Sequence, residues 1–268
     1  MGRDQPGRSR ANRDRFARIR RYVMFLGHPC SGHSLIGGLL DAHPDAVVAH
    51  EAGALRYLTA RYDRLRLYQV LLENAAASAT AGRPSGEYRY AVPGQWQGRS
   101  RRILVIGDKQ AEGATLRLRA RPWLLERLRR TVRVPLRLIH VIRNPFDTIA
   151  TIARRAAAGP YSPDLEVAMR RYFSLCATVD EIRPRLHEGE LYELRHEEFV
   201  AAPSRGLARL CAWLGLDPAS DYLAACRKTV RPTPRRSREA VRWSPALLAE
   251  VGARMQAHPH LAGYRFDG

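Results

Sequence analysis

The chain has 268 residues, 45% of them apolar, which is enough for one large α/β domain or two small ones with a packed core. This composition excludes a disulfide-stapled miniprotein and a wholly disordered chain. Lysine and arginine number 45 against 26 aspartates and glutamates, so the formal net charge is +19 and a negatively charged partner is expected. Because Lys109 and Lys228 are the only lysines, an arginine-rich codon usage explains this charge equally well.

Cysteine spacing and hydropathy bear on the compartment. The four cysteines form neither a Cys-x-x-Cys pair nor a run with zinc-ligand spacing, so we expect free thiols, a reducing cytoplasm and no metal site. They are Cys30, Cys176, Cys211 and Cys226. No apolar run approaches the roughly 20 residues that span a bilayer, and the apolar stretch 22–26 is too short for a signal peptide. We therefore expect no membrane anchor and no leader.

The elements expected in chain order alternate between strands and helices. Residues 1–20 mix arginines with Gly, Pro, Asn and Asp, and we expect a mobile basic arm there, followed by a single domain over 21–268. The strands are expected over 21–27, 103–106, 135–143 and 191–199. The helices are expected over 34–44, 52–77, 122–133, 146–158, 165–186, 204–216 and 245–257, with loops over 81–100 and 231–242. This alternation predicts a three-layer α/β fold, a central parallel sheet flanked by helices.

The loop after the first strand has the spacing of an anion-binding site. Residues 27–34 read GHPCSGHS, a G-x-x-x-x-G-x-S pattern that places backbone amides at the start of a helix, where they and the helix dipole stabilise a phosphate. The context of strand, loop and helix resembles that of P-loop nucleotide-binding proteins. An ATP-binding P-loop has lysine directly after the second glycine, however, and this chain has His33 there.

At this loop the chain resembles sulfotransferases that use 3′-phosphoadenosine 5′-phosphosulfate (PAPS). Their first motif reads roughly P-[K/R]-S-G-T-[T/S] and binds the 5′-phosphosulfate end of the donor. The matching residues here are Pro29, Cys30, Ser31, Gly32, His33 and Ser34. The following LLDAHPDAVVAHE is similar to the branch that includes protein-tyrosine and bacterial sulfotransferases. That resemblance implies Glu51 as the catalytic base, with His50 as the first substitute candidate.

A second motif of the same family follows the third expected strand. In the family, an arginine at the strand tip, a hydroxyl residue eight positions later and often another arginine four further on bind the 3′-phosphate. The segment RLIHVIRNPFDTIATIARR supplies Arg143, Thr151 and Arg155. Because Thr151 and Arg155 lie four apart on one helix face, all three are able to converge on one phosphate.

Weaker similarities extend the resemblance over most of residues 21–220. Residues 195–203 are similar to the family's R-Y-E-D-L-x-x-x-P stretch, with His196 in place of tyrosine. The resemblance implies that Lys109, after the second expected strand, stabilises charge at the transferred group. Near the C-terminus we expect a lid over the nucleotide from Arg235, Arg236, Ser237 and Trp243. In the loop over 81–100 we expect acceptor contacts from Tyr88, Tyr90 and Trp96.

Cys30 departs from the family pattern. The family places lysine or arginine there, and a thiol supplies no positive charge at neutral pH. A protonated His33 or Lys109 is expected to compensate, or the protein binds nucleotide without catalysis. A protonated His33 would make activity fall as the pH rises through its pKa.

The motifs together predict a PAPS-dependent sulfotransferase that releases the product adenosine 3′,5′-bisphosphate (PAP). The expected acceptor is a hydroxyl of a small molecule or carbohydrate, with in-line transfer and no nucleic-acid partner. One alternative is a P-loop kinase or nucleotide hydrolase, for which ILVIGD resembles a strand that ends in a magnesium-binding aspartate, Asp108. The other is a basic nucleic-acid-binding protein, favoured by the charge of +19. The sequence predicts no oligomeric state.

Overall fold

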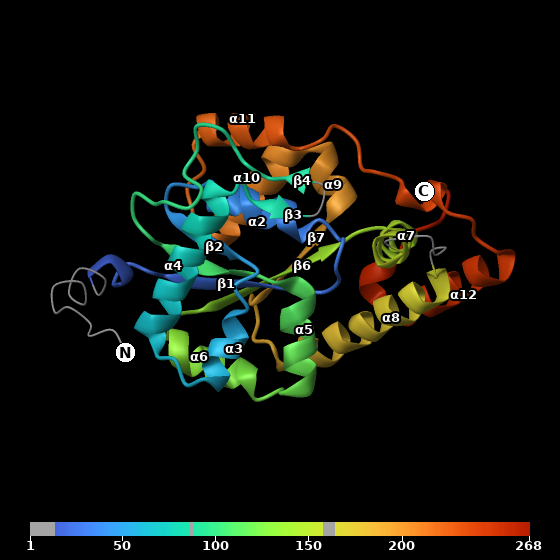
Figure 1. Ribbon diagram of the computed structural model, residues 1–268, viewed down its shortest axis with the longest axis horizontal. Coiled ribbons are helices and arrows are strands. Elements are labelled where there is room, and N and C mark those ends of the chain that lie inside the picture. The colour runs from blue at the N-terminus through green and yellow to red at the C-terminus, as the bar shows by residue number, and fades with distance from the viewer. Residues whose placement is uncertain (1–13, 86–87, 158–163) are drawn as a thin grey trace.

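A five-stranded parallel sheet forms the centre of the molecule. The computed structural model describes residues 14–85, 88–157 and 164–268. The sheet has the strand order β2-β5-β1-β6-β7 (Figure 1). Its strands are β1 (Arg21–Leu26), β2 (Ala46–His50), β5 (Val105–Lys109), β6 (Leu136–Ile142) and β7 (Leu191–Arg195). A separate two-stranded hairpin pairs β3 (Pro84–Ser85) with β4 (Tyr88–Arg89). The parallel α/β architecture expected from the sequence is therefore confirmed.

The strand order reverses direction at β1. This strand pairs with β5 on one side, where Val23 aligns with Gly107, and with β6 on the other, where Met24 aligns with Leu138. From β1 the chain crosses to the edge strand β2, returns to β5 beside β1, and then continues with β6 and β7 on the other side of β1, so the loops that leave the carboxyl ends of β5 and β6 diverge around the loop after β1. Such a switch point is where open α/β sheets leave a crevice for a ligand.

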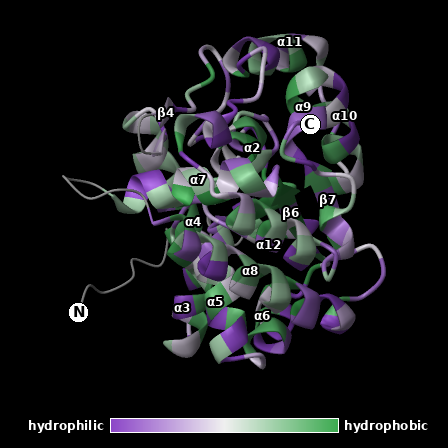
Figure 2. Cartoon of the chain, turned by 90° about the vertical axis from the view of Figure 1, so that its right-hand side faces the viewer, coloured by the Kyte–Doolittle hydropathy of each residue, from purple (hydrophilic) through white to green (hydrophobic). Residues whose placement is uncertain are grey.

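Helices cover both faces of the sheet. They are α2 (His33–Asp41), α3 (Ala54–Thr59), α4 (Arg64–Thr80), α5 (Ala111–Ala120), α6 (Leu124–Val132), α7 (Pro145–Ala156), α8 (Leu165–Ile182), α9 (His196–Ala201), α10 (Pro203–Leu214), α11 (Ser220–Thr229) and α12 (Pro245–Met255). Figure 2 shows hydrophobic and hydrophilic residues alternating along outer helices such as α8 and α10, as a one-sided packing contact requires. Among the described residues, no helix combines the length and the apolar character that crossing a bilayer demands.

Alternating side chains of β1 supply two cores. Tyr22, Met24 and Leu26 pack with residues of α3, α4 and α6 on one face. Val23 and Phe25 pack with residues of α2, α10 and α11 on the other. This period of two is what a strand buried on both faces produces. A third cluster joins α7, α8 and α12 beyond the end of β6, and it fixes the helix that carries Thr151 and Arg155.

The structure adds elements that the sequence pattern did not predict. Strand β2 and helices α5 and α11 were not among the expected elements, and the fourth expected strand, 191–199, ends at Arg195, where α9 begins. Residues 1–13 of the expected basic arm lie outside the described residues. Phe16 and Ile19, from the rest of that arm, are buried in the core, so the ordered fold begins before Arg21.

Candidate active site

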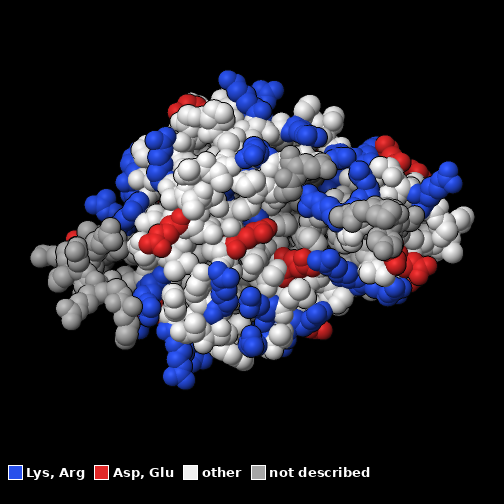
Figure 3. Space-filling model, viewed as in Figure 1, with Lys and Arg blue, Asp and Glu red and all other residues white. Residues whose placement is uncertain are grey.

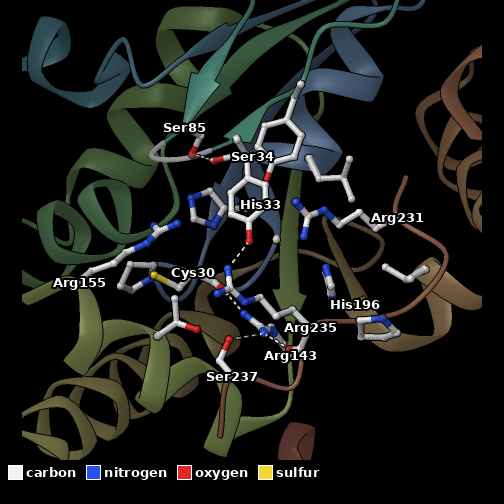
Figure 4. A pocket seen from close by; sticks show the side chains of 18 of the residues that line it. Cys30, His33, Ser34, Ser85, Arg143, Arg155, His196, Arg231, Arg235 and Ser237 are labelled. Atoms are coloured by element: carbon white, nitrogen blue, oxygen red, sulfur yellow. Dashed lines mark hydrogen bonds between the residues drawn. The ribbon is translucent and has the colours of Figure 1, made fainter. Parts of the chain in front are cut away.

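One pocket of about 450 Å³ lies where β1 and β6 end. It is walled by the loop after β1, helix α7, the β3–β4 hairpin and the segment 229–237 (Figure 4). The site residues predicted from the sequence that line it are Pro29, Cys30, Gly32, His33, Ser34, Glu51, Arg143, Thr151 and Arg155. Ser31 and Lys109, the remaining two, are buried and hold neighbours of the pocket in place. The fold thus brings the two motifs to one cavity.

The loop after β1 is shaped to present backbone amides. Gly27, Cys30 and Gly32 adopt positive φ angles of 108°, 64° and 98°. Gly32 precedes α2, and no side chain caps the first turn of that helix. Its free N–H groups and the helix dipole therefore face the pocket as an anion site. Glycine is needed at position 32 because a Cβ there would lie 2.3 Å from Cδ2 of His196.

Two hydrogen bonds, made by Ser31 and Gly27, hold this loop in place. The Ser31 hydroxyl donates to the His28 carbonyl oxygen at 3.1 Å, and the Gly27 N–H donates to Oγ1 of Thr115 at 2.9 Å. These bonds fix the loop without using the amides at the start of α2.

A lysine, a serine and a glutamate form a connected polar set at the base of the pocket. The Lys109 Nζ donates to Oε1 of Glu51 at 2.8 Å and to Oγ of Ser34 at 3.0 Å. Lys109 is fully buried, and a Cβ on Gly37 would lie 2.6 Å from its Cγ, so α2 packs directly on its side chain. The Glu51 side chain is 54% exposed and reaches the pocket. Glu51 therefore combines access to a ligand with a fixed cationic partner.

Burial and this ion pair set the charge of the two groups. Burial alone would raise the pKa of Glu51, but the charge and the hydrogen bond of Lys109 outweigh it and leave that pKa below its ordinary value. Burial lowers the pKa of Lys109, and Glu51 opposes that change. At neutral pH the Glu51 carboxylate is ionised and ready to accept a proton.

Neither neighbouring histidine supplies a positive charge. Burial, followed by the charge of Lys109, lowers the pKa of His33 well below 6.5, so its imidazole is neutral at pH 7. This burial disfavours the protonated His33 that was expected to compensate for Cys30. His50, the substitute base, bonds through Nε2 to the Pro84 carbonyl oxygen at 2.9 Å, and burial lowers its pKa to about 4. It does not line the pocket.

Cys30 is a neutral thiol in the loop. Burial raises its pKa, although the charges of Arg155 and Arg143 act in the opposite direction. A thiol in this state is neither a nucleophile nor a cation at pH 7.

Arg143 occupies the opposite side of the pocket. Its guanidinium donates to the Cys30 carbonyl oxygen at 3.1 Å, to Oγ of Ser237 at 3.3 Å and to the carbonyl oxygen of Arg235. Arg143 is buried, and its Nε has no partner in the described residues, which leaves a donor for a ligand. Thr151 donates its hydroxyl hydrogen to the Asp147 carbonyl oxygen at 2.7 Å and also lines the pocket.

The C-terminal segment covers this side as expected, but only in part. Arg235 and Ser237 line the pocket. Arg236 pairs with Glu239, and Trp243 packs on Phe146 while its Nε1 donates to a backbone carbonyl, so neither of these lid candidates lines the pocket.

The β3–β4 hairpin forms a wall that the sequence placed only as a loop. Ser85 donates to Oγ of Ser34 at 3.0 Å, which ties the hairpin to the anion-binding loop. Arg83, just before the hairpin, is buried in an ion pair with Asp41 of α2. Tyr88 and Tyr90 line the pocket, whereas Trp96 does not. Further pocket residues that sequence reasoning did not assign are Leu35, Arg89, Arg154, Val200, Thr229, Arg231, Thr233 and Pro234. Scattered arginines in an arginine-rich chain carry no signal that marks them.

Asp108 has a structural role. Its carboxylate accepts the N–H groups of Ala52 and Ala54 at 3.0 and 2.8 Å and so shapes the turn that carries Glu51. This use does not fit the magnesium-binding aspartate of the kinase alternative. Within the described ranges, no cluster of three His, Cys, Asp or Glu side chains is arranged to hold a metal ion.

An anion-binding loop at the switch point of a parallel sheet, faced by an arginine from a second strand tip, defines a nucleotide-binding α/β protein. Residues 23–221 match the sequence model of the Sulfotransferase family, so the chain belongs to that family and is a sulfotransferase-family enzyme. The PAPS-using class expected from the two motifs is confirmed by this membership. A search of curated protein sequences gave no match.

Solved structures of similar fold come from several bacterial systems. The sulfotransferase domain from the curacin biosynthetic pathway has a TM-score of 0.55 at 13% identity and covers 90% of this chain and 98% of that one. The sulfotransferase domain of the Synechococcus PCC 7002 olefin synthase has a TM-score of 0.53 at 15% identity, with 90% and 94% covered. Sulfotransferase STF9 from Mycobacterium avium has a TM-score of 0.51 at 13% identity, with 90% and 77% covered. At these identities the likeness concerns the fold.

Proposed function

We propose that this protein transfers a sulfuryl group from PAPS to a hydroxyl of a small-molecule or carbohydrate acceptor, with Glu51 as the general base. The observation that carries the proposal is the contact of Glu51 with Lys109, which also touches Ser34 of the anion-binding loop. A proton acceptor is thereby held next to the place where the loop binds an anion. The contacts of Lys109 with both Glu51 and Ser34 thus connect the proposed base to the anion-binding loop.

The residues at the pocket fit both ends of the donor. The uncapped start of α2 suits the 5′-phosphosulfate. Arg143, with its unpartnered buried Nε, and the Thr151 side chain suit the 3′-phosphate. PAPS, when bound, supplies the activated sulfuryl group.

The polar set at the base of the pocket performs the proton and charge steps. Glu51 takes the proton of the acceptor hydroxyl. At the same time the acceptor oxygen bonds to sulfur, and the bond from sulfur to the 5′-phosphate oxygen breaks. Lys109 holds Glu51 in position and places a positive charge beside Ser34. The hairpin residues Ser85, Tyr88 and Tyr90 form the wall nearest this loop, and we assign the acceptor to that side.

Donor binding is tested by calorimetric titration of PAP without magnesium, with adenosine 5′-monophosphate as the reference ligand. Arg143→Ala is expected to weaken PAP binding about tenfold or more, because a buried charged hydrogen bond to phosphate is lost, and to leave the monophosphate unchanged. Arg170→Ala, an exposed arginine on α8, is the matched control and should bind PAP as the wild type does. A folded wild-type protein that binds no PAP contradicts the proposal.

The base is tested by following PAP release from PAPS in the presence of a phenol and a sugar alcohol. Glu51→Gln keeps the shape of the side chain and is expected to lower kcat by roughly 10²-fold to 10⁴-fold with PAP affinity retained. Equal kcat in the variant and the wild type would assign the proton to another group.

A further inference from the structure

The anion-binding loop carries no positive side chain of its own. Position 30 holds a neutral thiol, and His33 is buried and neutral. Lys109 is buried under α2, paired with Glu51, and does not line the pocket. Charge that develops on the 5′-phosphate oxygen during transfer therefore lacks a neutralising side chain within the loop.

Arg155 reaches this loop from outside it. The residue lies on α7, one turn beyond Thr151, and lines the same pocket as Cys30 and His33. Figure 4 shows that its side chain ends beside His33, whereas Arg143 ends beside Ser237 and Arg235. The two arginines of the second motif thus point to different parts of the pocket.

The guanidinium of Arg155 is available to a ligand. It is exposed, and among the described parts of the chain it has neither a hydrogen bond nor an ion pair. Its charge nevertheless acts on both loop side chains. It is the strongest of the charges that oppose the raised pKa of Cys30, and it contributes to the lowered pKa of His33. Arg155 of α7 therefore contributes to the positive field at the loop, together with Lys109 at His33 and Arg143 at Cys30.

We propose that Arg155 replaces the loop cation that position 30 lacks and binds the 5′-phosphosulfate end of the donor, not its 3′-phosphate. This inference rests on the proposed function and changes the role that the spacing of the second motif indicates for Arg155. When the bond between sulfur and the 5′-phosphate oxygen breaks, the electron pair stays on that oxygen, and Arg155 stabilises its negative charge. Arg143 and Thr151 keep the 3′-phosphate.

Dissected nucleotides separate the two ends of the donor. Calorimetry is carried out with adenosine 5′-monophosphate, adenosine 3′-monophosphate and PAP, on the wild type, Arg155→Ala, Arg143→Ala and the control Arg170→Ala. Arg155→Ala is expected to weaken the 5′-monophosphate and PAP about tenfold or more and to leave the 3′-monophosphate unchanged. Arg143→Ala is expected to give the opposite pattern. Because Arg155 is exposed, its removal should leave the melting temperature unchanged.

Restoring the family's cation provides a second readout. Cys30→Lys in the Arg155→Ala background is expected to recover most of the lost affinity for the 5′-monophosphate, because a lysine at position 30 lines the same pocket. The proposal is overturned if Arg155→Ala weakens the 3′-monophosphate instead, or if no ligand is affected. A wild type that binds none of the three nucleotides refutes the proposed function itself, which is a distinguishable result.

Discussion

Single side chains at the pocket divide into groups that are charged at neutral pH and groups that burial keeps neutral. Glu51 and Lys109 neutralise each other across 2.8 Å, while His33 and Cys30, which belong to the same loop, carry no charge. The arginines therefore supply the positive charge that a donor with two anionic ends requires. The division follows from burial, which penalises a charge without a close partner.

This division predicts the pH dependence of transfer. Glu51 has a lowered pKa and is ionised above it, and His33 is already neutral, so neither group changes charge between pH 6 and 7.5. With an alcohol acceptor that does not titrate, kcat is expected to stay constant within about twofold over this interval. A steady loss of activity as the pH rises through 6.5 would instead require a protonated His33.

Residues in sequence motifs were predictable, and residues defined by tertiary contact were not. Spacing placed the loop after β1 and the pair Arg143 and Thr151 at one pocket, because consecutive parallel strands deliver their loops to one sheet edge. The charge of His33 was not predictable, since it depends on burial under distant segments. The contact of Ser85 with Ser34 joins residues 51 positions apart and leaves no local signature.

Helix α2 acts as both an anion site and a clamp. Its start faces the pocket, while Gly37 in its second turn packs on Lys109. Glycine inside a helix costs roughly 1 kcal/mol relative to alanine. The close contact with Lys109 therefore explains why glycine stands at position 37. Helix α2 therefore couples the position of the Lys109 side chain to that of the anion-binding loop at the start of the helix.

Gly37→Ala tests this clamp. The added Cβ would lie 2.6 Å from Cγ of Lys109, so the lysine must shift away from Glu51 and Ser34. We expect kcat to fall about 100-fold, the usual consequence of losing one aligned charge, with the fold retained. The measurement is steady-state kinetics together with thermal unfolding.

Gly252→Ala is the matched control, because no atom lies within 4 Å of a Cβ built at that helical glycine. It should keep full activity and unfold at the same or a slightly higher temperature. Wild-type kcat in Gly37→Ala would show that the position of Lys109 is not critical.

Strands and helices with a strong apolar pattern in the sequence were predicted, whereas those with a weak pattern were not. The apolar strands β1 and β6 were expected within one residue of their bounds, whereas β5, expected over 103–106, runs from Val105 to Lys109. Helix α5 was not predicted because its ten residues, AEGATLRLRA, begin one residue after a strand and include glycine. The strand β2 was not counted because only five residues separate the turn at His43–Asp45 from Glu51.

Considered as a whole, the molecule buries several histidines in neutral form. Burial lowers the pKa of His260 and His50 to about 4 and that of His196 to about 3, and it places the pKa of His28 well below 6.5. Protonation of His28, His50, His196 and His260 is therefore linked to the stability of the entire fold.

The sign of this linkage predicts acid sensitivity. The unfolded chain binds protons at these histidines near pH 6.5, and the folded protein binds them only at lower pH, so stability is lost as the pH falls below about 6.5. The melting temperature is expected to drop by about 5 °C or more between pH 7.5 and pH 5. Scanning calorimetry measures it, and an unchanged melting temperature would mean that the histidines are protonated in the folded state.

The overall charge of the molecule is spread out. Figure 3 shows Lys and Arg scattered over the viewed face, with a few acidic side chains between them. The arginines that we assign to the donor are instead gathered in one cavity. The net charge of +19 alone left both a nucleotide enzyme and a nucleic-acid binder open, and membership of the Sulfotransferase family favours the enzyme.

The burial of Lys109 also matters for chemical modification. The chain has two lysines; Lys109 is fully buried beneath α2, and Lys228 is exposed on α11. An acylating reagent therefore meets one side-chain amine at the surface, and that amine does not line the pocket. Lys228 thus offers one exposed lysine side chain for the attachment of a fluorophore or a support, away from the pocket.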